Sequence, residues 1–172
     1  MDLKRFSTWT FAACLAALPV TARSQQLPNP YGEDVGVEQA HRVADAALAE
    51  AKKNGWTVAA AVVDTHGELV YFSRLDGTQF GSNQVSQEKA RSAVRFKRPT
   101  KAFEDAVKGQ NVNVLGLSGA VPLEGGVPLL VNGKIVGALG VSGATSAQDG
   151  QCAKAGADTI AVGAAKPATP TK

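Results

Sequence analysis

The chain contains few residues that can form disulfides or bind metals. Its 172 residues include two cysteines, two histidines and one methionine, which is the initiator. No Cys/His spacing of the kind that holds zinc occurs. Aromatic residues are also scarce at 6%, whereas 18 glycines and a hydrophobic share of 44% are typical of a globular domain rich in small residues. The length fits one compact domain with tails.

The apolar run near the N-terminus, FAACLAALPV, is far shorter than the ~20 residues that span a bilayer. Two basic residues precede it and small residues follow, which is the pattern of a secretory signal peptide. We predict a signal over residues 1–24, cleaved after Ser24, with cleavage after Ala22 or an uncleaved anchor as alternatives. The remaining chain is then expected to be periplasmic or secreted, without stable membrane insertion. Cys14 leaves with the signal, so Cys152 has no intramolecular disulfide partner.

An excess of charge of one sign is also missing once the signal is removed. The formal net charge of +3 includes three basic residues and one acidic residue of the signal, so 15 basic and 14 acidic residues remain. Domains that bind nucleic acids are usually strongly basic. The balance of charge therefore predicts no nucleic-acid partner.

The pattern of apolar residues and turn signals predicts a helix, a hairpin, two helices, a second hairpin and a last helix. The expected ranges are 37–55, 57–74, 82–97, 100–108, 125–144 and 146–165. Strands joined by tight turns pair antiparallel, so the predicted fold class is α+β with a central antiparallel sheet flanked by helices. A linker over residues 25–36 precedes the domain at 37–164, and a disordered tail is expected over 165–172.

The most glycine-rich segment, GGVPLLVNGKIVGALGVSGA at 125–144, could be a phosphate loop or a hairpin. Its Gly-Lys pair is not followed by the Ser or Thr that a Walker loop requires. Asn132 and Gly133 readily take the two positive φ angles of a type I′ turn, which predicts a hairpin. Glycines within its strands, such as Gly140, indicate that a helix, a second subunit or a flat ligand comes close there.

Four segments together resemble the GlcG/HbpS family, which also supplies the C-terminal domain of PduO-type proteins. They are AVVDTHGELVYFSRLDG, QEKARSAVRFKRPT, the glycine-rich segment and QDGQCAKAGADTI, and the resemblance extends over residues 37–164. It implies a profilin-like domain with a central antiparallel sheet that assembles into homo-oligomers. It also implies haem as the suspected cofactor, with haem degradation or redox sensing as roles of secreted relatives.

Few residues can supply an axial haem ligand, which is usually His, Met, Cys or Tyr. His41 borders the apolar stripe of the first predicted helix. The resemblance favours a histidine on this helix, so His41 is the candidate for binding haem and its metal. His66 stands beside a glycine in a predicted turn, where a solvated histidine is expected. Cys152 lies among alanines and is expected to be a small core residue.

Basic residues on the second predicted long helix offer partners for carboxylates. Arg91 and Arg95 are four residues apart and share a helix face. They could pair with haem propionates or with the carboxylate of another small ligand, and a solvated face or a subunit contact is the alternative. Gly126, Pro128 and Gly140 of the glycine-rich hairpin complete the predicted cofactor site.

Two further functions stay open at this point. The chain could be a cofactor-free enzyme or binding protein for a small carboxylated metabolite, held near the glycine-rich strands and the two arginines. It could instead be a structural or sensor partner that uses oligomer surfaces alone. The sequence assigns no catalytic residue to any of these functions.

Overall fold

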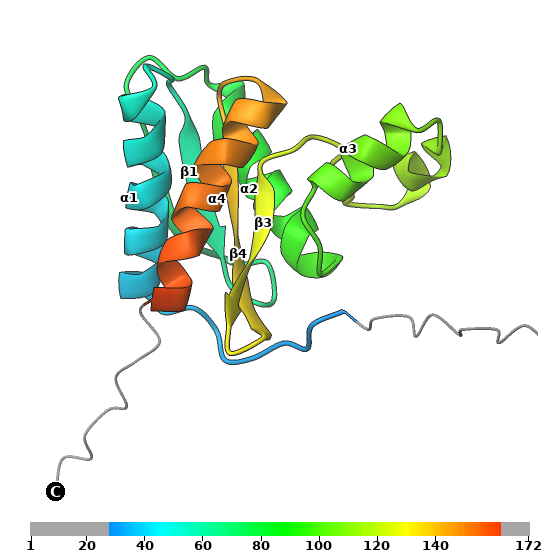
Figure 1. Cartoon of the computed structure of the whole chain (residues 1–172), viewed down its shortest axis with the longest axis horizontal. Helices are drawn as coiled ribbons and strands as arrows, with labels where there is room; N and C mark the ends of the chain where they lie inside the picture. The colour runs from blue at the N-terminus through cyan, green and yellow to red at the C-terminus, as the bar shows by residue number, and fades with distance from the viewer. Residues whose placement is uncertain (1–27, 163–172) are drawn as a thin grey trace, which may run out of the picture.

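The computed structural model describes residues 28–162, so the predicted signal segment 1–24 and tail 165–172 lie outside the described residues. The elements, in chain order, are helix α1 (Val37–Lys53), strands β1 (Ala59–Val63) and β2 (Leu69–Arg74), helices α2 (Gly81–Arg95) and α3 (Lys101–Lys108), the 3₁₀ helix η1 (Val112–Gly116), strands β3 (Gly126–Val131) and β4 (Lys134–Ser142), and helix α4 (Ser146–Val162). This order confirms the predicted α+β class (Figure 1).

The four strands form one antiparallel sheet in the order β2-β1-β4-β3. Each hairpin contributes two neighbouring strands, and the pairing of β1 with β4 joins the hairpins. Asn132 and Gly133 connect β3 to β4 with φ angles of 51° and 73°, which are the positive values that the predicted turn requires. The glycine-rich segment is therefore a hairpin of the sheet.

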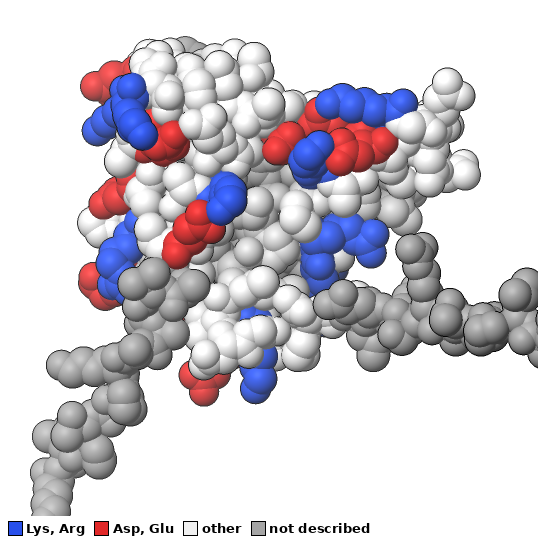
Figure 2. Space-filling model, in the orientation of Figure 1, with Lys and Arg blue, Asp and Glu red and all other residues white. Residues whose placement is uncertain are grey.

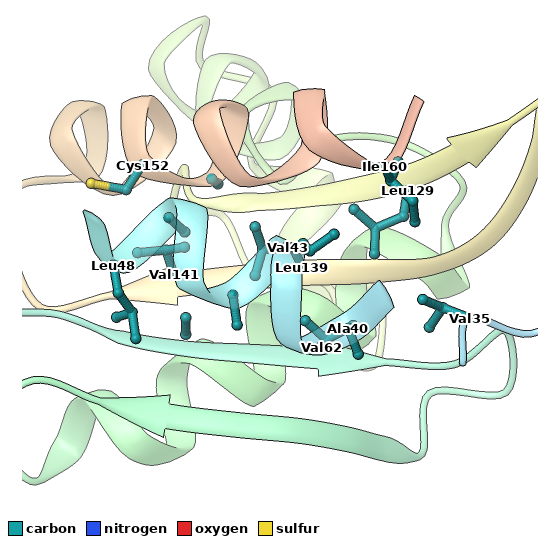
Figure 3. Packing of buried hydrophobic residues seen from close by; sticks show 14 of the residues in the cluster. Val35, Ala40, Val43, Leu48, Val62, Leu129, Leu139, Val141, Cys152 and Ile160 are labelled. Carbon is teal, nitrogen blue, oxygen red and sulfur yellow. The ribbon is translucent and has the colours of Figure 1, made fainter. Parts of the chain in front are cut away.

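Helices cover both faces of the sheet. Side chains alternate along β4, so Leu139 and Val141 point towards α1 and α4, and Ala138 points towards α2. Figure 3 shows the first of these layers, where Val43 of α1 meets Leu139 in the space between helices and sheet. The helices α1 and α4 thus share one face of the sheet, and α2 lies on the other.

The close contact between α2 and the sheet depends on Gly140. A Cβ atom at this position would overlap the backbone carbonyl oxygen of Ser86 and lie 2.6 Å from the backbone nitrogen of Ala90. The sequence left open whether a helix, a second subunit or a flat ligand approaches Gly140, and within the chain it is the helix α2 that does so. Gly140 is buried under α2 and is not available to a ligand within the chain.

The chain before α1 is attached to the sheet along part of the expected linker. The backbone N–H of Gly32 donates to the Ile135 carbonyl (2.7 Å), and the N–H of Val35 donates to the Val136 carbonyl (2.7 Å). Val35 is buried in the core. The packed domain therefore starts a few residues before α1, because this segment continues the sheet beyond the end of β1.

The helices α3 and η1 project away from the sheet (Figure 1), and Figure 2 shows basic and acidic side chains next to one another over this part of the surface. Within residues 28–162 no helix combines the length and the apolar character needed to cross a bilayer.

Candidate functional site

His41 lies on α1 next to strand β2. Its ring centroid is 4.9 Å from that of Tyr71, and its Nε2 atom is 3.2 Å from Oδ2 of Asp45, one helical turn further along. The histidine side chain is 51% exposed. The neighbouring Ala40 and Ala44 belong to the core, which places His41 at the border of the buried face of α1. The result is an accessible imidazole whose orientation is fixed by an aromatic ring and a carboxylate.

His66 has a different environment, in the turn between β1 and β2. Its side chain is 77% exposed, and its Nδ1 atom lies 3.9 Å from Oδ2 of Asp34. Asp34 accepts hydrogen bonds from the hydroxyl and the N–H of Thr65, which hold the pKa of this carboxyl below its ordinary value of 3.8. Asp64 accepts the N–H groups of His66 and Glu68. These carboxylates therefore stabilise the turn, and His66 is solvated as predicted.

Arg91 and Arg95 lie on α2 and border one cavity, as their shared helix face predicted. The cavity has a volume of about 280 Å³, and its other lining residues are Glu88, Gly119, Ala120 and Val121. Nε of Arg91 donates to the Gly67 carbonyl at 3.1 Å. The guanidinium of Arg95 fills the space that a Cβ atom at Gly119 would occupy.

The structure does not bring His41 together with the two arginines. His41 belongs to the α1 and α4 side of the sheet, and the arginines belong to the α2 side. A haem bound to His41 could meet Arg91 or Arg95 only if they came from a second copy of the chain. Their assignment as propionate partners therefore remains a prediction that depends on oligomerisation.

Gly126 and Pro128 lie on β3, away from both groups. Gly126 borders a cavity of about 470 Å³ that Lys101 and Lys154 also line, and its backbone exchanges hydrogen bonds with Thr100. Pro128 borders a separate cavity of about 220 Å³. Together with the burial of Gly140, this means that the three hairpin positions do not line one common pocket in the described chain.

An ion pair that no sequence pattern indicates lies in the interior, between Lys89 of α2 and Asp149 of α4. Nζ of Lys89 lies 2.7 Å from Oδ2 of Asp149 and 3.0 Å from the Val141 carbonyl, and the two charged side chains are only 2% and 3% exposed. Oδ1 of Asp149 accepts the N–H of Ala144, which lies just before α4. Burial raises the pKa of Asp149, and Lys89 opposes the rise. A Cβ atom at Gly125 would lie 2.9 Å from Nζ of Lys89. The backbone just before β3 therefore packs directly against the ion pair, and a side chain at position 125 would not fit.

A family model described as haem degrading protein HbpS-like matches residues 35–158. The chain belongs to this HbpS-like family. The match includes His41, both arginines, the buried ion pair and the whole sheet.

Individual relatives agree with this assignment. Protein GlcG of Escherichia coli K12 is 43% identical over 105 residues, which are 61% of this HbpS-like chain and 78% of GlcG. A double mutant of Streptomyces reticuli HbpS has 33% identity and a TM-score of 0.69, covering 84% of this chain and 98% of the other. The crystal structure of a PduOC:Heme complex has 25% identity and a TM-score of 0.66, covering 74% and 95%. One similar structure was thus solved with haem.

Proposed function

We propose that this HbpS-like chain binds haem, with His41 as the axial ligand. The observation that carries the proposal is the half-exposed imidazole of His41 between Tyr71 and Asp45. The haem complex of the similar PduOC structure supports the choice of cofactor. When bound, haem supplies the iron and oxygen chemistry, and the chain supplies the ligand and its surroundings.

The described residues fit such a group at His41 better than elsewhere. They include two histidines and no methionine. Cys152 is fully buried, and burial raises the pKa of its thiol to about 11, which disfavours a thiolate ligand. His66 has no aromatic neighbour of the kind that Tyr71 provides for His41.

The position of His41 also implies how haem would be covered. The side chain of His41 is 51% exposed, so haem at His41 would lie on the surface of one subunit. Covering both faces of a flat apolar ring removes more apolar surface from water than covering one face. We therefore propose that a second copy of the chain covers the other face, in a homo-oligomer.

Asp45 has a defined role in this proposal. Its carboxylate can hold one nitrogen of the His41 ring while the other nitrogen is left for a ligand. Such a carboxylate fixes the tautomer and the orientation of the ring. Asp45→Asn is therefore expected to weaken haem binding by about 10-fold without abolishing it.

A hemin titration followed at the Soret band tests the proposal. The wild-type chain and His41→Ala are compared with His66→Ala, which removes a more exposed histidine from a turn. We expect saturable Soret shifts for wild type and His66→Ala and a lost or strongly weakened shift for His41→Ala. Equal titration curves for all three proteins would refute the ligand assignment. Haem degradation can be tested on the same hemin-loaded sample. If the chain degrades haem, the Soret band is expected to disappear after ascorbate is added in air.

We also propose that the chain is exported, with residues 1–24 removed. The pattern of the signal segment supports this step. Intact-mass measurement of the protein from a periplasmic or culture fraction is expected to show a chain that begins at Gln25. A full-length chain that stays with the cytoplasmic fraction would contradict export.

A further inference from the structure

We propose that Arg91 and Arg95 form a binding site for a small monocarboxylate, separate from the haem site. The two guanidinium groups border the cavity of about 280 Å³ between α2 and residues 119–121. Volumes near 300 Å³ are at the lower end of those that hold small ligands. The site does not depend on haem, because His41 lies on the opposite side of the sheet.

Both arginines are available to an anion. Among residues 28–162, no Asp or Glu oxygen lies within 4.0 Å of a guanidinium nitrogen of Arg91 or Arg95. Glu88 lines the same cavity, but Nε2 of Gln84 donates to its Oε1 at 2.6 Å. Arg95 can offer a carboxylate a planar pair of N–H donors, and Arg91, whose Nε is held by Gly67, keeps terminal N–H groups for the same anion.

The cavity is also held in shape before any ligand arrives. Gly67 fixes Arg91 through its carbonyl, and Gln87 contacts the same guanidinium at 3.4 Å. Oγ of Ser92 accepts the N–H of Val121 at 3.0 Å, which ties the 119–121 segment to α2. Gly119 has φ of +81° and leaves room for the Arg95 side chain. A site with fixed donors loses less entropy on binding.

The charges that line the cavity select the class of ligand. Two arginines and Glu88 give a formal charge of +1, which one carboxylate neutralises. A second negative charge on the ligand would meet the Glu88 carboxylate without a matching cation, and like charges in one small site repel. A small monocarboxylate is therefore favoured over a dicarboxylate or a phosphate dianion.

Ligand-observed saturation-transfer NMR on the processed chain without haem tests the site. The probes are propionate, the neutral propionamide of similar shape, and malonate, all at constant ionic strength. We expect saturable transfer to the methyl group of propionate, with none to propionamide and weaker transfer to malonate. Equal transfer to propionate and propionamide, or stronger binding of malonate, would overturn the proposal.

Two variants link the signal to this cavity. Arg95→Gln removes an exposed guanidinium and is expected to weaken propionate binding about 10-fold or more, since a charge-assisted hydrogen bond contributes about 1.5–3 kcal/mol. Arg98→Gln removes an exposed arginine that does not line the cavity and is expected to leave binding unchanged. Unchanged binding in Arg95→Gln, or an equal loss in Arg98→Gln, would show that propionate binds elsewhere. Neither result tests His41 as the haem ligand, because His41 and these arginines lie on opposite sides of the sheet within one chain.

Discussion

Replacing Lys89 by methionine tests the role of the buried ion pair in the fold. The substitution keeps most of the length of the side chain but removes its ammonium group, which leaves the carboxylate of Asp149, 3% exposed, without its cation. Removing one partner of a buried pair generally costs about 3–5 kcal/mol, because the remaining charge is desolvated and uncompensated. With a urea m value of about 2 kcal/mol/M, a loss of about 4 kcal/mol lowers the midpoint of unfolding by about 2 M.

The pH dependence of the Lys89→Met variant provides a second, independent signature. Burial already raises the pKa of Asp149 above 3.8, and loss of Lys89 removes the main opposing charge. A carboxyl whose pKa is raised in the folded state favours folding most at low pH, and this contribution is lost as the pH rises through the folded-state pKa. The destabilisation by Lys89→Met is therefore expected to be smaller near pH 4 than near pH 8.

Two further variants make the result specific. Lys154→Met removes an exposed lysine from α4, whose partner Asp158 is also exposed, and is expected to cost no more than about 0.5 kcal/mol. The double variant Lys89→Met/Asp149→Asn removes both charges and is expected to recover at least half of the loss. A Lys89→Met variant as stable as Lys154→Met at pH 8, or a loss that does not change with pH, would refute the assignment of Lys89 and Asp149 as a buried charged pair.

Other predictions concern packing and the single thiol. Gly140→Ala is expected to lower the melting temperature by about 5–10 °C, because its Cβ overlaps α2, whereas Gly116→Ala, with open space around it, is expected to change it little. Cys152 is expected to resist a thiol reagent at pH 8 in the folded chain and to react fully in denaturant, because it is buried and its pKa is about 11. Rapid labelling of the native protein would contradict this burial.

Much of the fold could be predicted because its signals are local. The start of α1 at Val37, the turn at Asn132 and Gly133, and the antiparallel hairpins all follow from residues that are near one another in the chain. Gly140 was expected to allow a close approach, and the structure identifies α2 as the element that approaches. The spacing of apolar residues and the residue types at turns predict such features, and neither depends on the tertiary structure.

The candidate site was harder to predict because it depends on which sheet face each helix covers. His41 and Arg91 lie on two different predicted helices, and a single sequence does not tell whether these helices cover the same face of the sheet. Lys89 and Asp149 are 60 residues apart, and each is of a residue type that is usually exposed. Only the three-dimensional packing shows that they meet in the interior.

Imidazole rescue of a His41→Gly variant tests the central claim, that His41 is the haem ligand of this HbpS-like chain, most directly. The Soret spectrum with hemin is recorded for wild type, for His41→Gly, and for His41→Gly with added imidazole. We expect the variant to lose the wild-type spectrum and imidazole to restore it, because the free base can occupy the place of the missing ring. A His41→Gly spectrum identical to that of wild type before imidazole is added would contradict the claim.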